Sequence, residues 1–553
     1  MADPDGNAKD GPDIERALST ACSSSIASSH QRRGDGNEKP DPPSHTGTDL
    51  SLHRIVSRRE IVLSRIRSRP PIGNFAHPLA HKQTTVEELV DFDGPGDPYK
   101  PLNWPMEKKI ITTVLYGLTT MGSTWASSVF APGIPQISEQ FHVSTTVATL
   151  GLSLLLAGFG VGPLLWAPLS EVYGRKIAVL VPYFIAACFS FGTAAAKDVQ
   201  TIMITRFFAG FFGSAPVTNT GGVLGDLYNP GQRGIAMAGY ALAVVGGPAL
   251  GPVVGSAVVV QPFLRWRWTE YLTGILQMFI LLLDVVWIDE SYAPVLLVYK
   301  ARRLRFESGN WALHAAFEEW DVTIKELARK FLIRPFALLA TPICFLMALY
   351  ASFCYGILYS QLGSIPVIFQ ENRGWKPVPG ALPFLAILVG AWVGCAINVY
   401  NQKLYNVKWH RAGERAVPEA RLPPMMVGSV FFAGGMFIVG WTGDKSYPWV
   451  APCLGLTSLG IGFFTIFQAA LNYLVDTFQH YAASAVAANT FLRSCFAAAF
   501  PLFVVPMYHN LGICWASSLT GLIGVAMIPI PFLFFIFGKS IRAKGEWSKD
   551  SVF

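Results

Sequence analysis

Long apolar stretches follow one another along most of this chain, and they constrain its fold more than any other feature. Each is long enough to cross about 30 Å of hydrocarbon as a helix. We distinguish twelve, at 110–132, 146–167, 177–195, 201–224, 234–258, 268–288, 336–359, 378–400, 423–441, 448–472, 484–507 and 512–537. The pattern predicts an all-α integral membrane protein.

The composition leads to the same conclusion. Of 553 residues, 51% are hydrophobic and only 14% are charged, with a mean hydropathy of +0.37. Soluble domains carry about 25% charged residues, and they cannot cover so many apolar side chains. The net charge of +7 lies in tails and loops, which indicates contact with a membrane surface and not with nucleic acid.

The predicted spans fall into two sets of six, separated by a charged segment. We expect a disordered cytosolic tail over 1–103, because this region is polar and rich in Ser, Pro, Asp and Arg. A six-helix bundle is then expected over 104–290, a cytosolic linker over 291–335, a second bundle over 336–538 and a cytosolic tail over 539–553. The alternating charges of the linker suggest short interfacial helices.

Matching glycine pairs link the two halves. Gly158 and Gly162 in the second span have the same spacing as Gly390 and Gly394 in the eighth. Small residues four apart allow helix backbones to approach closely. The match suggests two pseudo-symmetric bundles, as in many alternating-access transporters.

Lys and Arg in the short loops predict the orientation. Residues 175–176, the linker, the loop 403–421 and the tail 539–549 would share the cytosolic side, so both termini would be cytosolic. Arg265 and Arg267 argue weakly against this. We expect the plasma membrane, and a vacuolar or vesicular membrane stays open.

The most specific motif runs from Gly162 to Lys176 and reads GPLLWAPLSEVYGRK. A carboxylate, a glycine turn and two cations follow the glycine face of the second span. They suggest a conformational latch, in which Glu171 meets a helix N-terminus of the other half. Arg175 and Lys176 would pair with acids such as Glu171 or Asp226 in one conformer and release them in the other. The predicted latch residues are Gly162, Ser170, Glu171, Gly174, Arg175 and Lys176.

Two further motifs lie inside predicted spans. Arg206 stands in an apolar helix, where it either faces a cavity and holds an acid or a substrate, or extends to the outer headgroups. The segment from Gly246 to Gly255 repeats Gly and Pro, which predicts a kinked helix that packs closely on its neighbours. Its predicted motif residues are Gly247, Pro248, Gly251, Pro252 and Gly255.

With these motifs, the chain resembles the major facilitator superfamily, and in particular its fungal twelve-span drug:proton antiporters. The resemblance covers about residues 100–545 and includes SYAPVLL from Ser291, YGILY from Tyr355 and ANTFLRS from Ala488. Ala238 and Ser256 replace glycines of the antiporter motif, and Glu171 replaces an aspartate. The resemblance implies a major facilitator fold of twelve helices in two six-helix bundles, and the export of amphipathic molecules in exchange for protons by alternating access.

Proton coupling requires a titratable group near the cavity. Asp284 is the clearest acid within a span, and burial would raise its pKa. Glu270 is a second candidate, and Arg206 is a third, as a cation that could hold a proton-carrying acid. For either acid, a structural role such as pairing with a nearby cation is an equal alternative.

Polar and aromatic residues of several spans could line the substrate cavity, and ordinary helix packing is the alternative for each. Pairs four residues apart share a helix face, and aromatic rings with a few amides suit flat, partly polar compounds. The candidates are Asn219, Tyr355, Tyr359, Phe467, Gln468, Asn472, Asn489 and Arg493.

Enzymatic function is not expected. The eight cysteines form no CxxC pair, the ten histidines are scattered, and no phosphate-binding G-x-x-x-x-G-K-[ST] occurs. We therefore expect no cofactor, no metal site and no ATP hydrolysis. The expected partners are a small amphipathic substrate, protons and the bilayer, and the expected state is a monomer. A polyamine transporter or an uptake symporter remains the alternative function.

Overall fold

The structure is a computed structural model that describes residues 88–94, 96–319, 332–411, 413 and 417–544. All of them belong to one unit of the chain, residues 72–553. The first 87 residues of the predicted tail, most of the C-terminal tail and part of the linker lie outside the described residues. Among the described residues, the regular secondary structure is helical apart from one isolated bridge between Leu89 and His314.

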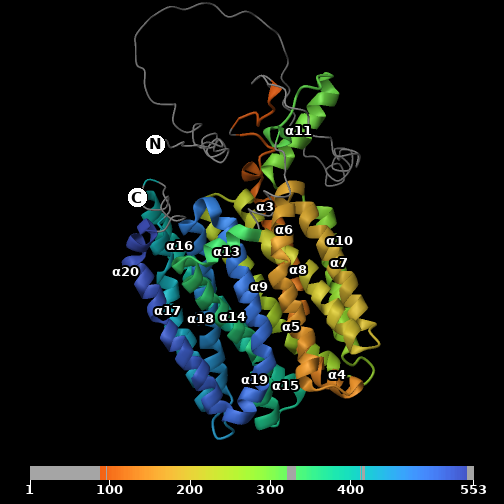
Figure 1. The fold of residues 1–553 in the computed structure, drawn as a ribbon, viewed down its shortest axis with the longest axis vertical. Coiled ribbons are helices and arrows are strands. Elements are labelled where there is room, and N and C mark those ends of the chain that lie inside the picture. Colours follow the sequence, from red (N-terminus) through yellow and green to blue (C-terminus); the bar gives the residue numbers. More distant parts are fainter. Residues whose placement is uncertain (1–87, 95, 320–331, 412, 414–416, 545–553) are drawn as a thin grey trace, which may run out of the picture. The chain divides into compact units, whose positions relative to one another are not determined.

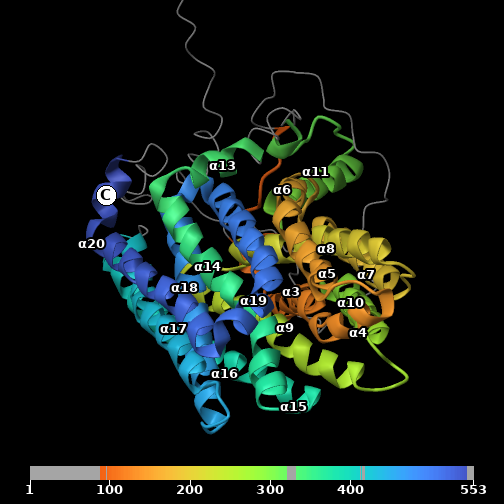
Figure 2. The same cartoon turned by 60° about the horizontal axis from the view of Figure 1, so that its bottom comes forward.

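The predicted twelve-helix membrane fold is confirmed. The first half contains α3 (Met106–Ser128), α5 (Thr145–Val161) with α6 (Pro163–Tyr173), α7 (Arg175–Ala194), α8 (Val199–Leu227), α9 (Pro230–Val259) and α10 (Arg267–Trp287). The second half contains α14 (Pro342–Pro366), α16 (Phe384–Arg411), α17 (Pro423–Thr442), α18 (Val450–Thr477), α19 (Ala482–Met527) and α20 (Pro529–Lys544). The two groups, orange to yellow-green and green to blue, lie side by side in both views (Figure 1, Figure 2).

Short elements connect these helices. They are η2 (Pro101–Asn103), η3 (Ala131–Gly133), α4 (Ile134–Phe141), α11 (Ala293–Ser308), η4 (Ala316–Glu319), α13 (Arg334–Leu339), η6 (Val367–Asn372), α15 (Pro377–Ala381), η7 (Pro418–Arg421) and η8 (Gln479–Tyr481). Among the described residues, eight helical segments are long and apolar enough to span a membrane, and the bent pair α5–α6 is a ninth.

Two spans depart from straight helices. Between α5 and α6 the axis bends by 42° at Gly162, because Pro163 follows and lacks the N–H of a continuous helix. At Gly512 the backbone turns to φ +75° within α19, which separates the eleventh span from the twelfth.

Several boundaries differ from the predicted spans. Residues 168–173 are helical in α6, so Ser170 and Glu171 lie on a helix and not in a loop. Helix α16 continues to Arg411 and α20 to Lys544, beyond 400 and 538. The sequence becomes polar after these positions, which ends the apolar pattern used for the prediction. The backbone hydrogen bonds of a helix do not require apolar side chains, so the helix continues.

The end of the predicted tail is ordered against the linker. The Val90 N–H donates to the His314 carbonyl over 2.8 Å, and Val90 packs with Ala301 and Ala315. Lys300 Nζ lies 3.3 Å from Asp97 Oδ2. Residues 88–94 and 96–103 therefore differ from the disorder expected for them.

The glycine pairs of the two halves make equivalent contacts. A Cβ on Gly158 would collide with the Phe207 carbonyl of α8, and a Cβ on Gly390 with the Thr457 carbonyl of α18. The second span thus packs on the fourth as the eighth packs on the tenth. Closely approaching backbones fix these two pairs and hold the charged motifs at the helix ends.

Candidate functional site

The turn between α6 and α7 places the cations of the predicted latch. Gly174 adopts φ +93° and ψ 162°, a region open almost only to glycine. The Glu290 carboxylate, just beyond α10, accepts from the Arg175 N–H over 2.8 Å and from the Lys176 N–H over 3.0 Å. Glu290 therefore caps the N-terminus of α7, whose positive dipole end favours an anion.

The side chains of both cations turn inward at the same place. Arg175 Nε lies 3.1 Å from Asp226 Oδ2, and Arg175 Nη1 donates to Ser170 Oγ over 2.8 Å. Lys176 Nζ donates to the Ile288 carbonyl. We call the end of the bundle that carries residues 174–176 the latch end. Sequence reasoning named Asp226 but missed Glu290, since a cap supplied by a distant segment has no local signal beyond an acid that follows a span.

Glu171 lies half-buried on α6. Its predicted contact with a helix N-terminus of the other half stays a prediction.

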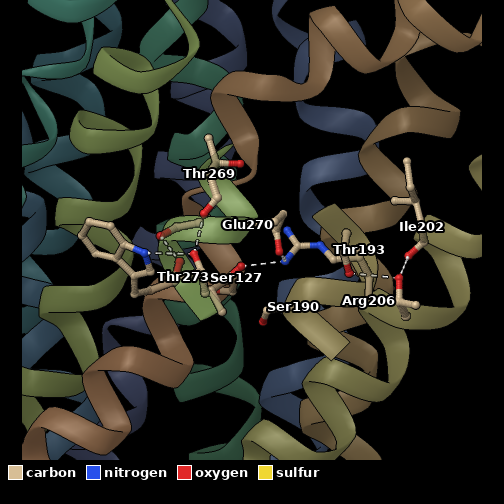
Figure 3. Close-up of polar contacts among 12 residues, drawn as sticks. Ser127, Ser190, Thr193, Ile202, Arg206, Thr269, Glu270 and Thr273 are labelled. Carbon is tan, nitrogen blue, oxygen red and sulfur yellow. Dashed lines mark hydrogen bonds and ion pairs between the residues drawn. The ribbon is translucent and has the colours of Figure 1, made fainter. Parts of the chain in front are cut away.

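Deep in the first half, Arg206 and Glu270 face each other (Figure 3). Both are completely buried. Arg206 Nη1 lies 3.3 Å from Glu270 Oε1 and 2.8 Å from the Ala126 carbonyl, and the guanidinium stands 4.0 Å from the centre of the Phe130 ring. Arg206 thus does not extend to headgroups, and opposite charges hold the pair together in a buried site.

Glu270 begins a stripe of buried polar side chains along α10. Thr273, Gln277 and Asp284 follow it on the same face and are at most 2% exposed. Thr273 accepts from Trp125 Nε1 over 3.3 Å, Gln277 accepts from Ser190 Oγ over 3.2 Å, and Asp284 Oδ2 accepts from Thr119 Oγ1 over 2.6 Å. Buried polar groups are normally paired, but Asp284 Oδ1 has no hydrogen-bond partner among the described residues.

The Gly-Pro motif of α9 packs on α3. Added Cβ atoms on Gly247, Gly251 and Gly255 would all collide with residues 124–129, and Ser128 Oγ donates to the Gly247 carbonyl over 3.1 Å. Pro248 and Pro252 lie within the helix. Backbone approach without side chains makes this seam close and stiff.

Some of the substrate candidates come together in the second half. Tyr355 and Tyr359 of α14 have ring centres 5.1 Å apart, and Tyr355 lies 6.3 Å from Phe467 of α18. Arg493 of α19 stands 4.6 Å from the Tyr355 ring centre. Ser127 of α3 hydrogen-bonds Tyr359 over 2.9 Å, which places this cluster where the two halves meet.

The remaining candidates are amides. Asn219 donates weakly, over 3.4 Å, to the Trp166 carbonyl of α6. Gln468 and Asn489 are buried and have side-chain polar atoms with no hydrogen-bond partner among the described residues. Asn472 is half-buried.

Among the described residues, no group of three or more His, Cys, Asp or Glu side chains could hold a metal ion.

Comparison with known proteins identifies the family. Residues 116–501 match the model of the Major Facilitator Superfamily. The chain belongs to this superfamily of membrane transporters. The prediction of a transporter and not an enzyme is confirmed by this membership.

Several relatives are fungal. The chain is 52% identical to the efflux pump bik6 of Gibberella fujikuroi, over 87% of this chain and 99% of the relative. It is 41% identical to the multidrug transporter FLU1 of Candida albicans, over 83% of this chain and 76% of that relative. It is also 41% identical to a citrinin biosynthesis cluster transporter of Monascus ruber, over 85% and 95%.

A solved structure shows the same fold. The xylose transporter XylE of Escherichia coli in a partially occluded inward-open state aligns with a TM-score of 0.53 at 16% identity, over 78% of this chain and 98% of XylE.

Proposed function

We propose that this transporter exports amphipathic small molecules, either drugs or a toxic metabolite of the cell, in exchange for protons by alternating access. The names of the relatives, an efflux pump, a multidrug transporter and a citrinin-cluster transporter, support export. The observation that carries proton coupling is the buried polar stripe of α10, with an acid at each end.

Asp284 is the proton carrier in this proposal. One of its carboxylate oxygens is held by Thr119 while Oδ1 has no partner in the described chain, so a proton can bind there without breaking an existing contact. A buried carboxylate without a cation is stabilised by protonation. Protonation or deprotonation of Asp284 therefore changes the stability of the conformer that buries this acid.

Arg206 and Glu270 play a supporting part. Their charges compensate each other inside the bundle, and protonation of Glu270 would leave Arg206 buried without a counter-ion, which is costly. We therefore assign this pair to positioning α8 against α10.

The latch end faces the cytosol in this proposal, because Arg175, Lys176 and the basic residues of the linker lie there. Both termini are then cytosolic, and the protein works in the plasma membrane. Substrate leaves through the opposite end.

Reconstituted vesicles test the coupling. In the wild type, an outward substrate flux driven by an imposed pH gradient should collapse when a protonophore is added. Asp284→Asn should abolish the gradient-driven flux and retain gradient-independent exchange of substrate, because an amide cannot carry the proton. Asp289→Asn is the matched control, since Asp289 lies outside the stripe and pairs with Lys108 at the surface.

Flux that persists without the gradient would contradict proton coupling. Gradient-driven flux by Asp284→Asn at the wild-type rate would remove Asp284 from the mechanism.

A further inference from the structure

Three aromatic rings of the second half pack against one another in the interior. Tyr355 lies 6.0 Å from Phe463 and 6.3 Å from Phe467 between ring centres, and the planes of Phe463 and Phe467 are 9° apart. Offset, nearly parallel rings of this kind accept a further flat ring at stacking distance.

Arg493 stands over two of these rings. Its guanidinium carbon is 4.6 Å from the Tyr355 ring centre and 5.0 Å from that of Phe467, while the residue is 6% exposed. Within the described chain no carboxylate lies in salt-bridge distance of it, and its Nε is buried without an acceptor. Cation–π contacts with two rings recover only part of the cost of a buried cation.

Two amides next to these residues are also unsatisfied. Asn489 lies one turn before Arg493 on α19, and its Oδ1 has no partner among the described residues. Gln468 follows Phe467 on α18, and both its amide nitrogen and its amide oxygen are buried without a partner there. Buried polar atoms left unpaired are costly, so unpaired atoms on two neighbouring helices favour a missing polar ligand.

The charges around Arg493 decide the sign of that ligand. Helices α14, α16, α17, α19 and α20 contain no Asp or Glu, and α18 contains only Asp476. Asp476 is bound to Arg421, with its Oδ2 2.8 Å from Arg421 Nε. Glu270 and Asp226 in the first half are likewise bound to their own arginines. The positive charge of Arg493 is thus left without a counter-ion from any of these helices.

We propose that Arg493 is the anion-binding group of the substrate site, and that the transported compounds include planar aromatic molecules with an acidic group, a carboxylate or a phenolate. The ring of the compound stacks on Tyr355 and Phe467, the guanidinium donates to its anionic oxygen, and the amides of Gln468 and Asn489 bind further polar substituents. This inference rests on the proposed function only in taking the cluster as part of the substrate path.

Binding can be measured without a proton gradient. We would follow the fluorescence polarisation of anthracene carboxylate, its neutral methyl ester and anthracenylmethylammonium with the purified full chain in nanodiscs. A hydrogen bond to a charged group contributes about 1.5–3 kcal/mol, or roughly a tenfold to hundredfold change in Kd. We expect the carboxylate to bind at least about tenfold more tightly than the ester, and the ammonium compound more weakly than both.

Variants assign the effect to Arg493. Arg493→Gln should weaken carboxylate binding to about the level of the ester and weaken ester binding much less, whereas Arg493→Lys should retain most of the preference. Arg334→Gln is the matched control, because Arg334 also faces an aromatic ring, that of Tyr481 at 5.3 Å, outside the cluster. The fluorescence-detected unfolding temperature shows whether each variant is folded.

Equal affinity for acid and ester, or tighter binding of the cation, would overturn the proposal. So would an equal loss of acid and ester binding in Arg493→Gln. A selective wild type whose transport ignores the proton gradient would instead contradict the proposed coupling and leave the anion site standing.

Discussion

The two halves solve the same problem at the latch end by different means. Helix α7 begins with Arg175 and Lys176, whose N–H groups need acceptors, and Glu290 supplies them. Its counterpart α17 begins with Pro423 and Pro424 and has no side-chain cap. Proline has no N–H to satisfy. A carboxylate cap can be released and remade, and a proline cannot, so the comparison assigns the movable contact to the first half.

The ion pairs of the halves correspond more closely. Asp226 and Asp476 are each the penultimate residue of their helices, α8 and α18. Asp226 binds Arg175 and Asp476 binds Arg421, although Arg421 also stacks 3.4 Å from the Tyr405 ring centre. The second-half network reaches the other half, since Asn406 next to it donates to the Gly231 carbonyl of α9 over 3.3 Å. The Asp226 network thus makes its contacts within the first half, whereas the Asp476 network lies at the boundary between the halves.

The largest expected effect follows from substituting the turn glycine. Gly174→Ala would force a side chain into φ +93° and bring its Cβ within 2.5 Å of Glu290 Oε2. We expect a loss of about 3 kcal/mol in unfolding free energy and no transport. Thermal unfolding of purified protein and vesicle flux measure both.

The control for Gly174 comes from the other half. Gly413 also has positive φ, +67°, but a Cβ there meets nothing within 4 Å. Gly413→Ala should cost about 1 kcal/mol and leave transport intact. Equal losses in the two variants would mean that the Glu290 cap does not distinguish the halves.

Removing the charge of the cap should have a smaller effect. Glu290 Oε1 accepts from the Ser291 and Tyr292 N–H groups as well as from Arg175. Glu290→Gln keeps the shape but weakens these charge-assisted bonds, by about 2 kcal/mol in total. Amide hydrogen exchange in the first turn of α7 should then accelerate about thirtyfold.

Asp289→Asn is the neighbouring control, because its pair with Lys108 is about one-third exposed on both sides and contributes at most about 1 kcal/mol. An unchanged rate of amide hydrogen exchange in Glu290→Gln would show that another group caps the N-terminus of α7.

The fold could be read from the sequence further than the site could. Apolar length predicted the helices, because the membrane imposes it on every span independently. Matching glycines predicted equivalent packing, which Gly158 and Gly390 show. Arg206 stood in a motif of the fourth span and Glu270 outside any motif in the sixth, and only the tertiary structure shows that they face each other.

Three kinds of site information were out of reach of the sequence. The cap by Glu290 depends on where α10 ends relative to α7. The unbalanced charge of Arg493 depends on which acids already form ion pairs with other arginines. The helical conformation of residues 403–411 depends on backbone bonding that apolar patterns do not record.

The smallest expected effect belongs to the prolines that replace a cap. Pro423→Ala adds one N–H group to the first turn of α17, at a position that is half-buried. It also raises the conformational entropy of the unfolded chain. We expect a loss of about 0.5–1 kcal/mol in unfolding free energy and wild-type flux, because no releasable contact is removed. A flux defect in Pro423→Ala as large as that expected for Gly174→Ala would contradict the assignment of the movable contact to the first half, since it would make the start of α17 equally sensitive.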